Sequence, residues 1–510
     1  MDSQNLSRRQ FVWLSSCAIG AGCMGSPVSF AAQDETEGWN PDQPFYSPGK
    51  KLKVQPVFMY SLPTPKVAAS WKSWGGVQTE QAVVEETARI DAELKRMAKQ
   101  AEFGLEILPL VKITAAEAAR KLPEHEWDVT LVYACTGGGA LLRACLGLKP
   151  DTLIFVRQRS GPGYYWYEAL STRYLLTDSP TSTTSERQSE PRAHVDDVVV
   201  DDYAELVWRL RALHAVKNLL GTRIVALGGP WGKYAPDAPQ KSQERFGLKI
   251  IDVSYDDFGP RVQRALADAK VMAAGEEWVR RYLALPHTRL KTERKFVVNA
   301  FVLYRLFKEM MHEHEATAFT IKSCMGTILP MAQTTACLTL SLLNDEGLIA
   351  FCESDFVIIP AGLLLRHIAS QPVFLHNSTF PHNAMVTCAH CTCPRRLDGK
   401  KYEPVELMTH YESEYGAAPK VEMPLGQEVT FIDPEYSTAR WVGFKGTVKG
   451  NPHYDICRSQ QDVEVQGAWK KLLPEVRDSH WVMTYGNWLK ELGYATRKIG
   501  VQWVNLADAA

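Results

Sequence analysis

The chain has 510 residues, of which 45% are hydrophobic and 23% charged, a globular composition with enough apolar material for two or three domains. Its formal net charge is −1 and no long run of like charge occurs, which argues against nucleic acid or an anionic lipid surface as a partner. No later stretch reaches the ~20 consecutive apolar residues of a membrane-spanning helix, so no integral membrane span is expected.

The N-terminal segment has the features of an export signal. Paired Arg8 and Arg9 are followed by a weakly apolar stretch with glycines and by small residues up to Ala31. A charged region, an apolar region and a small-residue cleavage site are typical of secretory signals, and the arginine pair is typical of the twin-arginine route. We therefore expect a twin-arginine signal peptide over residues 1–32 and a mature protein that works in the periplasm or at the cell exterior. Lipid attachment at Cys17 is an alternative.

Strand-like and helix-like patterns alternate through the first half of the mature chain. Residues 81–101 have Val83, Ile90, Leu94 and Met97 at helical spacing. Expected strands are 54–60, 105–110, 129–134, 153–156 and 224–227. Such alternation is typical of parallel sheets covered by helices. Residues 177–192 are rich in Ser, Thr and Pro and poor in apolar side chains, so this insertion is expected to be disordered.

The second half continues this pattern and then changes. A strand at 248–253, helical regions at 260–273 and 276–311, a strand at 318–323 and a helix at 331–343 are expected. From residue 372 onward short extended runs dominate, among them 429–432, 441–448 and 480–485, before a closing helix at 488–498. We therefore expect an N-terminal α/β domain at 50–230, a second α/β domain at 231–345 and a β-rich C-terminal domain at 346–510.

Two glycine loops follow expected strands. Thr136 to Gly139 opens a helix, where backbone N–H groups can face an anion or a sugar hydroxyl. It lacks the spaced glycines of a dinucleotide fingerprint and the Lys-Ser/Thr pair of a phosphate loop, so nucleotide binding is disfavoured. Gly228 to Trp231 ends another expected strand, where open parallel sheets place ligands. A tight turn that requires positive φ explains either loop equally well.

Candidate reactive side chains are most concentrated between Ile321 and Cys393. The acidic pair Glu353 and Asp355 ends one extended run, and His376 with Asn377 ends the next. A third run ends at His390. Three strand ends that meet at one edge could bring an oxygen ligand and imidazoles around one cation.

The cysteines suggest no disulfide framework. Nine of the eleven lie beyond the expected signal, at irregular spacing. Cys388, Cys391 and Cys393 invite a thiolate zinc site, but a structural site needs further ligands and Cys457 is the only later cysteine. Buried thiols that pack as small apolar groups are the alternative.

The motifs of this region, taken in order, resemble the L-fucose isomerase and L-arabinose isomerase superfamily. The likeness extends over about residues 321–486 and rests on the runs CMG, LND-G, C-E-x-D, P-V-F, A-H-C-x-x-P and HWVMTYGNW. The resemblance implies an α/β fold with two Rossmann-like α/β domains followed by a β-rich C-terminal domain, as in L-fucose isomerase. It also implies a homo-oligomer with a sugar or oligosaccharide as partner.

In that family a Mn²⁺ ion, held by two carboxylates and histidine, bridges adjacent oxygens of an open-chain sugar. Proton transfer between C1 and C2 through a cis-enediol then interconverts aldose and ketose. The metal polarises the carbonyl and a carboxylate moves the proton. The resemblance places the first carboxylate at Glu353, the last histidine at His480 and the intermediate histidine of arabinose isomerases at His390.

The chain departs from the family at the second carboxylate, where the matching residue is Asn377. An amide cannot act as a general base and is a weaker, neutral metal ligand. His376 could take its place, so the expected ligands of Mn²⁺ or another divalent metal are Glu353, His376, His390 and His480. The candidate catalytic residues are Glu353, Asn377 and Asp355. Further polar candidates for substrate binding are Lys322, Glu412 and Arg458.

The leading hypothesis is therefore an exported aldose–ketose isomerase of the fucose/arabinose type. A glycoside-cleaving enzyme on the same fold is one alternative, and it needs two carboxylates ~5 to 10 Å apart, such as Glu353 with Asp355 or Glu412. A non-catalytic glycan-binding protein is the other.

Overall fold

The computed structural model describes residues 38–47, 49–122, 127–149, 151–171, 174–177 and 193–506. The expected signal peptide and residues 178–192 of the expected insertion lie outside these ranges, so both remain predictions.

A parallel sheet with the strand order β2-β1-β4-β5-β8 forms the first part of the fold, and β3 also pairs with β1. Its strands are β1 (Leu52–Met59), β2 (Leu105–Ile107), β3 (Val111–Ile113), β4 (Val129–Ala134), β5 (Thr152–Val156) and β8 (Val198–Val200). The central strands β4 and β5 are buried along their whole length, which explains their mainly apolar sequences. A short parallel pair, β6 (Leu175–Leu176) and β7 (Ala193–His194), is followed by the 3₁₀ turn η2 (Val195–Asp197).

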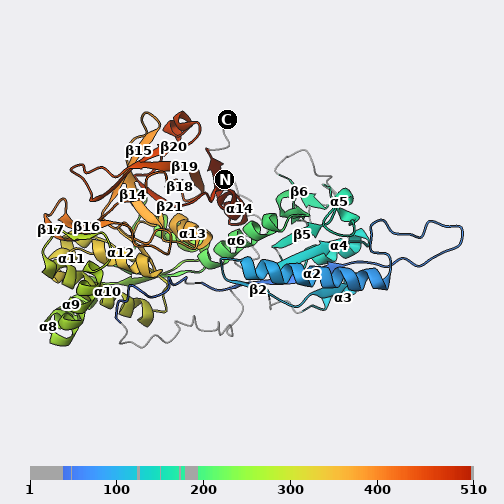
Figure 1. The fold of residues 1–510 in the computed structure, drawn as a ribbon, viewed down its shortest axis with the longest axis horizontal. Coiled ribbons are helices and arrows are strands. Elements are labelled where there is room, and N and C mark those ends of the chain that lie inside the picture. Colours follow the sequence, from blue (N-terminus) through green and yellow to red (C-terminus); the bar gives the residue numbers. More distant parts are fainter. Residues whose placement is uncertain are drawn as a thin grey trace, which may run out of the picture. The chain divides into compact units, whose positions relative to one another are not determined.

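Helices accompany this sheet, and several of them contact its strands (Figure 1). They are α2 (Glu80–Gln100), α3 (Ala116–Arg120), α4 (Gly139–Leu146), α5 (Trp166–Ala169) and α6 (Tyr203–Leu219). The side chain of Thr79 caps α2 by accepting the N–H of Ala82. The apolar face predicted for this helix is confirmed, because Val83, Ile90 and Leu94 are buried.

A second parallel sheet has the order β10-β9-β12-β13. Its strands are β9 (Arg223–Leu227), β10 (Lys249–Val253), β12 (Ala318–Ile321) and β13 (Ile349–Phe351). The helices of this part are α7 (Ala238–Phe246), α8 (Tyr255–Ala267), α9 (Ala269–Leu283), α10 (Arg294–Glu313), α11 (Cys324–Ala332), α12 (Cys337–Glu346) and α13 (Ile359–Ala369).

The helical region expected at 276–311 is two helices. α9 ends at Leu283, and the chain forms the short strand β11 (Thr288–Leu290) before α10 begins. Pro286 lies between the two helices, where its ring and missing N–H oppose a continuous helix. β11 pairs with β16 (Val405–His410), which in turn pairs with β17 (Tyr415–Val421) in a separate small sheet.

The C-terminal part is a mainly antiparallel sheet that closes on itself. Its strands are β14 (Phe374–Ser378), β15 (Met385–His390), β18 (Glu428–Pro434), β19 (Arg440–Gly450), β20 (Ser459–Val465), β21 (His480–Tyr485) and β22 (Gln502–Asn505). The order β18-β21-β14-β15-β20-β19 closes because β19 also pairs with β18, and β22 adds to β19 in parallel. The 3₁₀ turns η3 (Trp469–Lys471) and η4 (Leu473–Glu475) precede β21, and α14 (Leu489–Lys498) follows it. The extended runs and the closing helix predicted here are confirmed.

These sheets confirm the coarse prediction of a mixed α/β protein with parallel sheets and a β-rich C-terminal region. The second sheet extends beyond the domain expected at 231–345, because β9 precedes residue 231 and β13 follows residue 345. The boundaries of the sheet therefore differ from those of the expected domain.

Among the described residues, no single helix is long and apolar enough to cross a membrane. Only α11 and α12 counted together, across a bend of 92°, have the required length and composition.

Candidate metal centre

Glu353 lies in a sharply turned loop directly after β13. Glu353 and Ser354 both adopt the left-handed region, with φ of 65° and 49°. Non-glycine residues rarely adopt this conformation, and it persists where the surroundings enforce it. The second glycine loop supplies that constraint: the N–H of Trp231 donates to the carbonyl of Ser354 at 3.2 Å, and the N–H of Phe356 donates back to Trp231 at 2.9 Å.

Two histidines of the closed sheet face this carboxylate. His390 ends β15 and His480 begins β21. The Nε2 atom of His390 lies 3.6 Å from Oε1 of Glu353, and Nε2 of His480 lies 3.4 Å from Oε2. One ligand atom from each of these three residues lies within 4.8 Å of the other two. The strand ends of two different sheets therefore converge on one point.

The remaining nitrogen of each imidazole is also held. Nδ1 of His480 lies 2.7 Å from Oδ2 of the buried Asp355, and Nδ1 of His390 lies 3.1 Å from the hydroxyl of Thr392. Asp355 is itself fixed, because its Oδ1 accepts the backbone N–H groups of Lys233 and Val357 at 3.0 and 3.2 Å. Outer partners of this kind orient metal-ligating histidines in proteins.

One ionised carboxylate dominates the electrostatics of the site. Burial opposes the charge of Glu353, but contacts with His390 and His480 outweigh it and hold the pKa of this carboxyl well below its usual range. Burial likewise disfavours a charged His480, yet Asp355 and Glu353 raise the pKa of its imidazole to about 9. The ammonium group of Lys233 lies 3.6 Å from Oε2 of Glu353 and 3.3 Å from Nε2 of His480. A metal ion at Glu353 would therefore replace the proton of His480 and compete with the ammonium of Lys233 for this carboxylate.

The donor set fits a divalent transition metal. One carboxylate and two imidazoles whose other nitrogens are held leave further coordination positions for a substrate. Such a set is softer than the oxygen ligands that Mg²⁺ prefers. Glu353, His390 and His480 therefore form a group that could hold a metal ion.

His376, the fourth expected ligand, does not join this group. It pairs with Trp481 across β14 and β21 and is buried among the rings of Phe374, Phe431 and Trp481. Burial lowers the pKa of its imidazole to about 3. Asn377 pairs instead with His480, so Asn377 shares the face of His480 and His376 lies on the opposite face.

The other sequence candidates lie in varied positions. Asp355, expected to be catalytic, is fully buried and positions His480. Arg458 donates from Nε to the carbonyl of Thr409 at 2.7 Å, and Glu412 is exposed between β16 and β17. Lys322 follows β12, and its carbonyl accepts the hydroxyl of Tyr255.

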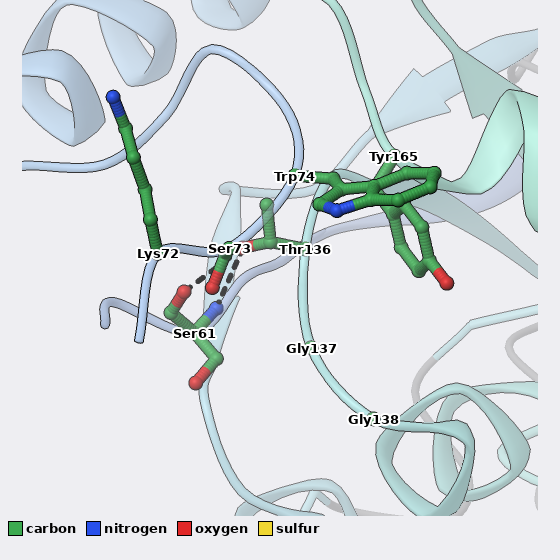
Figure 2. A pocket seen from close by; sticks show the side chains of 8 residues that line it. All are labelled: Ser61, Lys72, Ser73, Trp74, Thr136, Gly137, Gly138 and Tyr165. Carbon is green, nitrogen blue, oxygen red and sulfur yellow. Dashed lines mark hydrogen bonds between the residues drawn. The ribbon is translucent and has the colours of Figure 1, made fainter. Parts of the chain in front are cut away.

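The first glycine loop lines a cavity of about 270 Å³ with Ser61, Trp74 and Tyr165 (Figure 2). The hydroxyl of Thr136 accepts the N–H of Ser61 at 2.9 Å and donates to its carbonyl at 3.0 Å. Lys72 extends away from the glycines (Figure 2). Gly137 in the first loop has a φ of 127°, and Gly228 and Gly229 in the second have φ of 81° and 92°. Both loops therefore contain turns whose positive φ favours glycine.

Lys233 is the group that sequence reasoning missed. It lies two residues beyond Trp231, and its approach to Glu353 depends on the contact between the loops after β9 and β13. The glycine loop was the available signal, because ligands in parallel sheets lie at the carboxyl ends of strands.

No protein-family model and no curated protein matches the sequence.

Proposed function

We propose that the protein is a divalent-metal-dependent sugar isomerase of the fucose/arabinose type, exported by the twin-arginine route. The observation that carries the proposal is the convergence of Glu353, His390 and His480 with both imidazoles oriented by outer partners. These are the three ligands that the resemblance also implies, and they follow its order along the chain. The two Rossmann-like domains and the homo-oligomer belong to the same proposal.

When bound, a divalent metal, Mn²⁺ by resemblance, polarises the carbonyl and hydroxyl oxygens of an open-chain sugar. By resemblance, Glu353, whose carboxylate is ionised at neutral pH, is the candidate acceptor of the proton that moves between C1 and C2. Lys233, 3.6 Å from Glu353, can stabilise the negative charge that develops on the sugar oxygen.

Glycoside cleavage finds less support at this site. Hydrolysis of a glycoside needs two carboxylates that reach the substrate. Asp355 is buried beneath His480 with both oxygens occupied, and Glu412 lies on an exposed turn. Asp355 therefore cannot serve as a proton donor opposite Glu353.

The first experiment is elemental analysis of the full chain, purified from cytoplasm, after loading with Mn²⁺. Wild type should bind near one equivalent that Glu353→Gln and His480→Ala lose, whereas Glu412→Gln, which removes an exposed carboxylate, should retain it. Asp355→Asn should weaken metal binding about 10- to 100-fold, because His480 loses its anionic partner. Wild type that takes up no divalent metal at Glu353 would refute the proposal.

Turnover is then measured on a panel of aldoses and ketoses. Wild type should interconvert one pair, and Lys233→Met should lose turnover while keeping the metal, with partial rescue by Lys233→Arg. Metal binding and sugar binding without interconversion would instead favour the non-catalytic glycan-binding alternative.

A further inference from the structure

A second group of ligating atoms lies at four other positions. Ligand atoms of Cys337, Cys391 and His410 all lie within 4.8 Å of one another, and all three side chains are buried. The thiol of Cys457 contacts that of Cys391 but lies outside the group of atoms within 4.8 Å of one another, so it is the outermost member of a set of three sulfurs and one imidazole. We call these four residues the thiol cluster.

The members of the thiol cluster come from four separate elements. Cys337 begins α12, Cys391 follows β15, His410 ends β16 and Cys457 lies two residues before β20. The start of a helix stabilises a thiolate, because its free N–H groups carry partial positive charge. The N–H of Arg458 also points at the sulfur of Cys391, at 3.5 Å.

A buried imidazole nitrogen in the cluster is unpaired. His410 is 6% exposed, and its Nδ1 has no hydrogen-bond partner among the described residues. Buried polar atoms without partners are uncommon, because they lose their contacts with water without replacement. An unpaired buried nitrogen on a histidine of the cluster is an independent indication of a ligand.

The thiols also crowd one another. The thiol of Cys391 contacts both that of Cys337 and that of Cys457. Ionised sulfurs at such close range repel one another unless a cation lies between them.

We propose that Cys337, Cys391, Cys457 and His410 bind a structural zinc ion. Three thiolates and one imidazole form a closed tetrahedral set that zinc prefers. Cys337, Cys391 and His410 already lie together, and the thiol of Cys457, which contacts that of Cys391, would move inward to become the fourth ligand. Binding would release the three thiol protons, and Arg458 lies beside the resulting anionic centre.

This site differs from the one that sequence spacing suggests. Cys388 and Cys393 are buried at other points and do not belong to the cluster. Because Cys391 directly follows His390, the zinc would also anchor the end of β15 that holds His390 against Glu353. The inference does not depend on the isomerase proposal.

The test uses full-length Glu353→Gln protein, in which the first metal site is disabled, after loading with Zn²⁺. It should retain about one equivalent of zinc, which adding His410→Ala or Cys391→Ser removes and adding Cys388→Ala does not. X-ray absorption should show about three sulfur ligands at ~2.3 Å and one nitrogen at ~2.0 Å. Cobalt in place of zinc should give a thiolate charge-transfer band.

The spectra require only the Glu353→Gln protein, so they test for thiolate and imidazole ligands even if the cysteine variants fail to fold. A disulfide between any two of the three cysteines, a first shell of oxygen and nitrogen alone, or no retained zinc would overturn the proposal.

Discussion

Two buried aspartates of this protein, Asp355 and Asp345, differ in how many of their oxygens accept hydrogen bonds. Both oxygens of Asp355 are occupied, by His480 and by two backbone N–H groups. Asp345 at the end of α12 accepts the N–H groups of Arg395 and Arg396 through Oδ1 alone, at 2.6 and 2.8 Å. Its buried Oδ2 has no partner among the described residues. Burial therefore outweighs the nearby arginines and raises the pKa of Asp345 to about 7.

This raised pKa predicts a pH dependence of stability. The folded protein binds the proton of Asp345 more tightly than the unfolded chain, whose pKa is near 3.8. The contribution of this proton to the free energy of unfolding is fully present below about pH 4. It is lost as the pH rises through about 7, by up to about 1.4 kcal/mol per pH unit. Asp345→Asn stays neutral and keeps an oxygen for both N–H groups. Thermal unfolding should show that the stability of Asp345→Asn rises relative to that of wild type between about pH 5 and pH 8. Stability curves that run parallel over this pH range would contradict the raised pKa of Asp345.

At the scale of elements, a glycine lets α13 lie close against β13, the strand that leads to Glu353. A Cβ atom at Gly362 would lie 2.5 Å from the ring of the buried Phe351. Gly326 in α11 is exposed, and a Cβ there would meet nothing within 4 Å. Helix propensity favours alanine at both sites by about 1 kcal/mol, so packing decides the difference.

Gly362→Ala should therefore destabilise the protein by about 1 kcal/mol, because overpacking of about 1–3 kcal/mol exceeds the gain in propensity. Gly326→Ala should stabilise it by about 0.4–1 kcal/mol. Unfolding in urea measures both. Equal stabilisation by the two substitutions would mean that Phe351 moves aside freely.

At the scale of the molecule, the last helix joins the C-terminal sheet to the first parallel sheet. α14 packs against α6, and β22, which follows it, pairs with β19. The ammonium of Lys498 lies 3.0 Å from the carboxylate of Asp197 and 3.2 Å from that of Asp151. The hydroxyl of Tyr494 donates to Asp197 at 2.7 Å.

Lys498→Met should lower the free energy of unfolding by up to about 3–5 kcal/mol, because it removes the nearer cation of the buried Asp197 and leaves only Arg497, at 3.9 Å. The matched control is Lys490→Met on the same helix, whose exposed pair with Glu205 should contribute only about 0–1 kcal/mol. Thermal unfolding gives the comparison, and hydrogen exchange should show faster opening of β5 and β8 in Lys498→Met alone. A similar small effect of both variants would show that Asp197 does not depend on Lys498.

The sequence by itself determined the order and type of most elements, because each follows from local periodicity and turn residues. The mainly apolar run at 129–134 forms β4, and the helical spacing of Val83, Ile90 and Leu94 gives the buried face of α2. Glu353, His390 and His480 were identified by their places at strand ends and in the family motifs.

Tertiary structure alone decided which of these side chains meet. His376 and Asn377 are neighbours in sequence, but strand alternation and the pairing with β21 put only Asn377 on the face of His480. Lys233 reaches Glu353 from 120 residues away, and the thiol cluster draws on positions from 337 to 457. Such contacts depend on how sheets pack and register, which are long-range properties that no local pattern encodes.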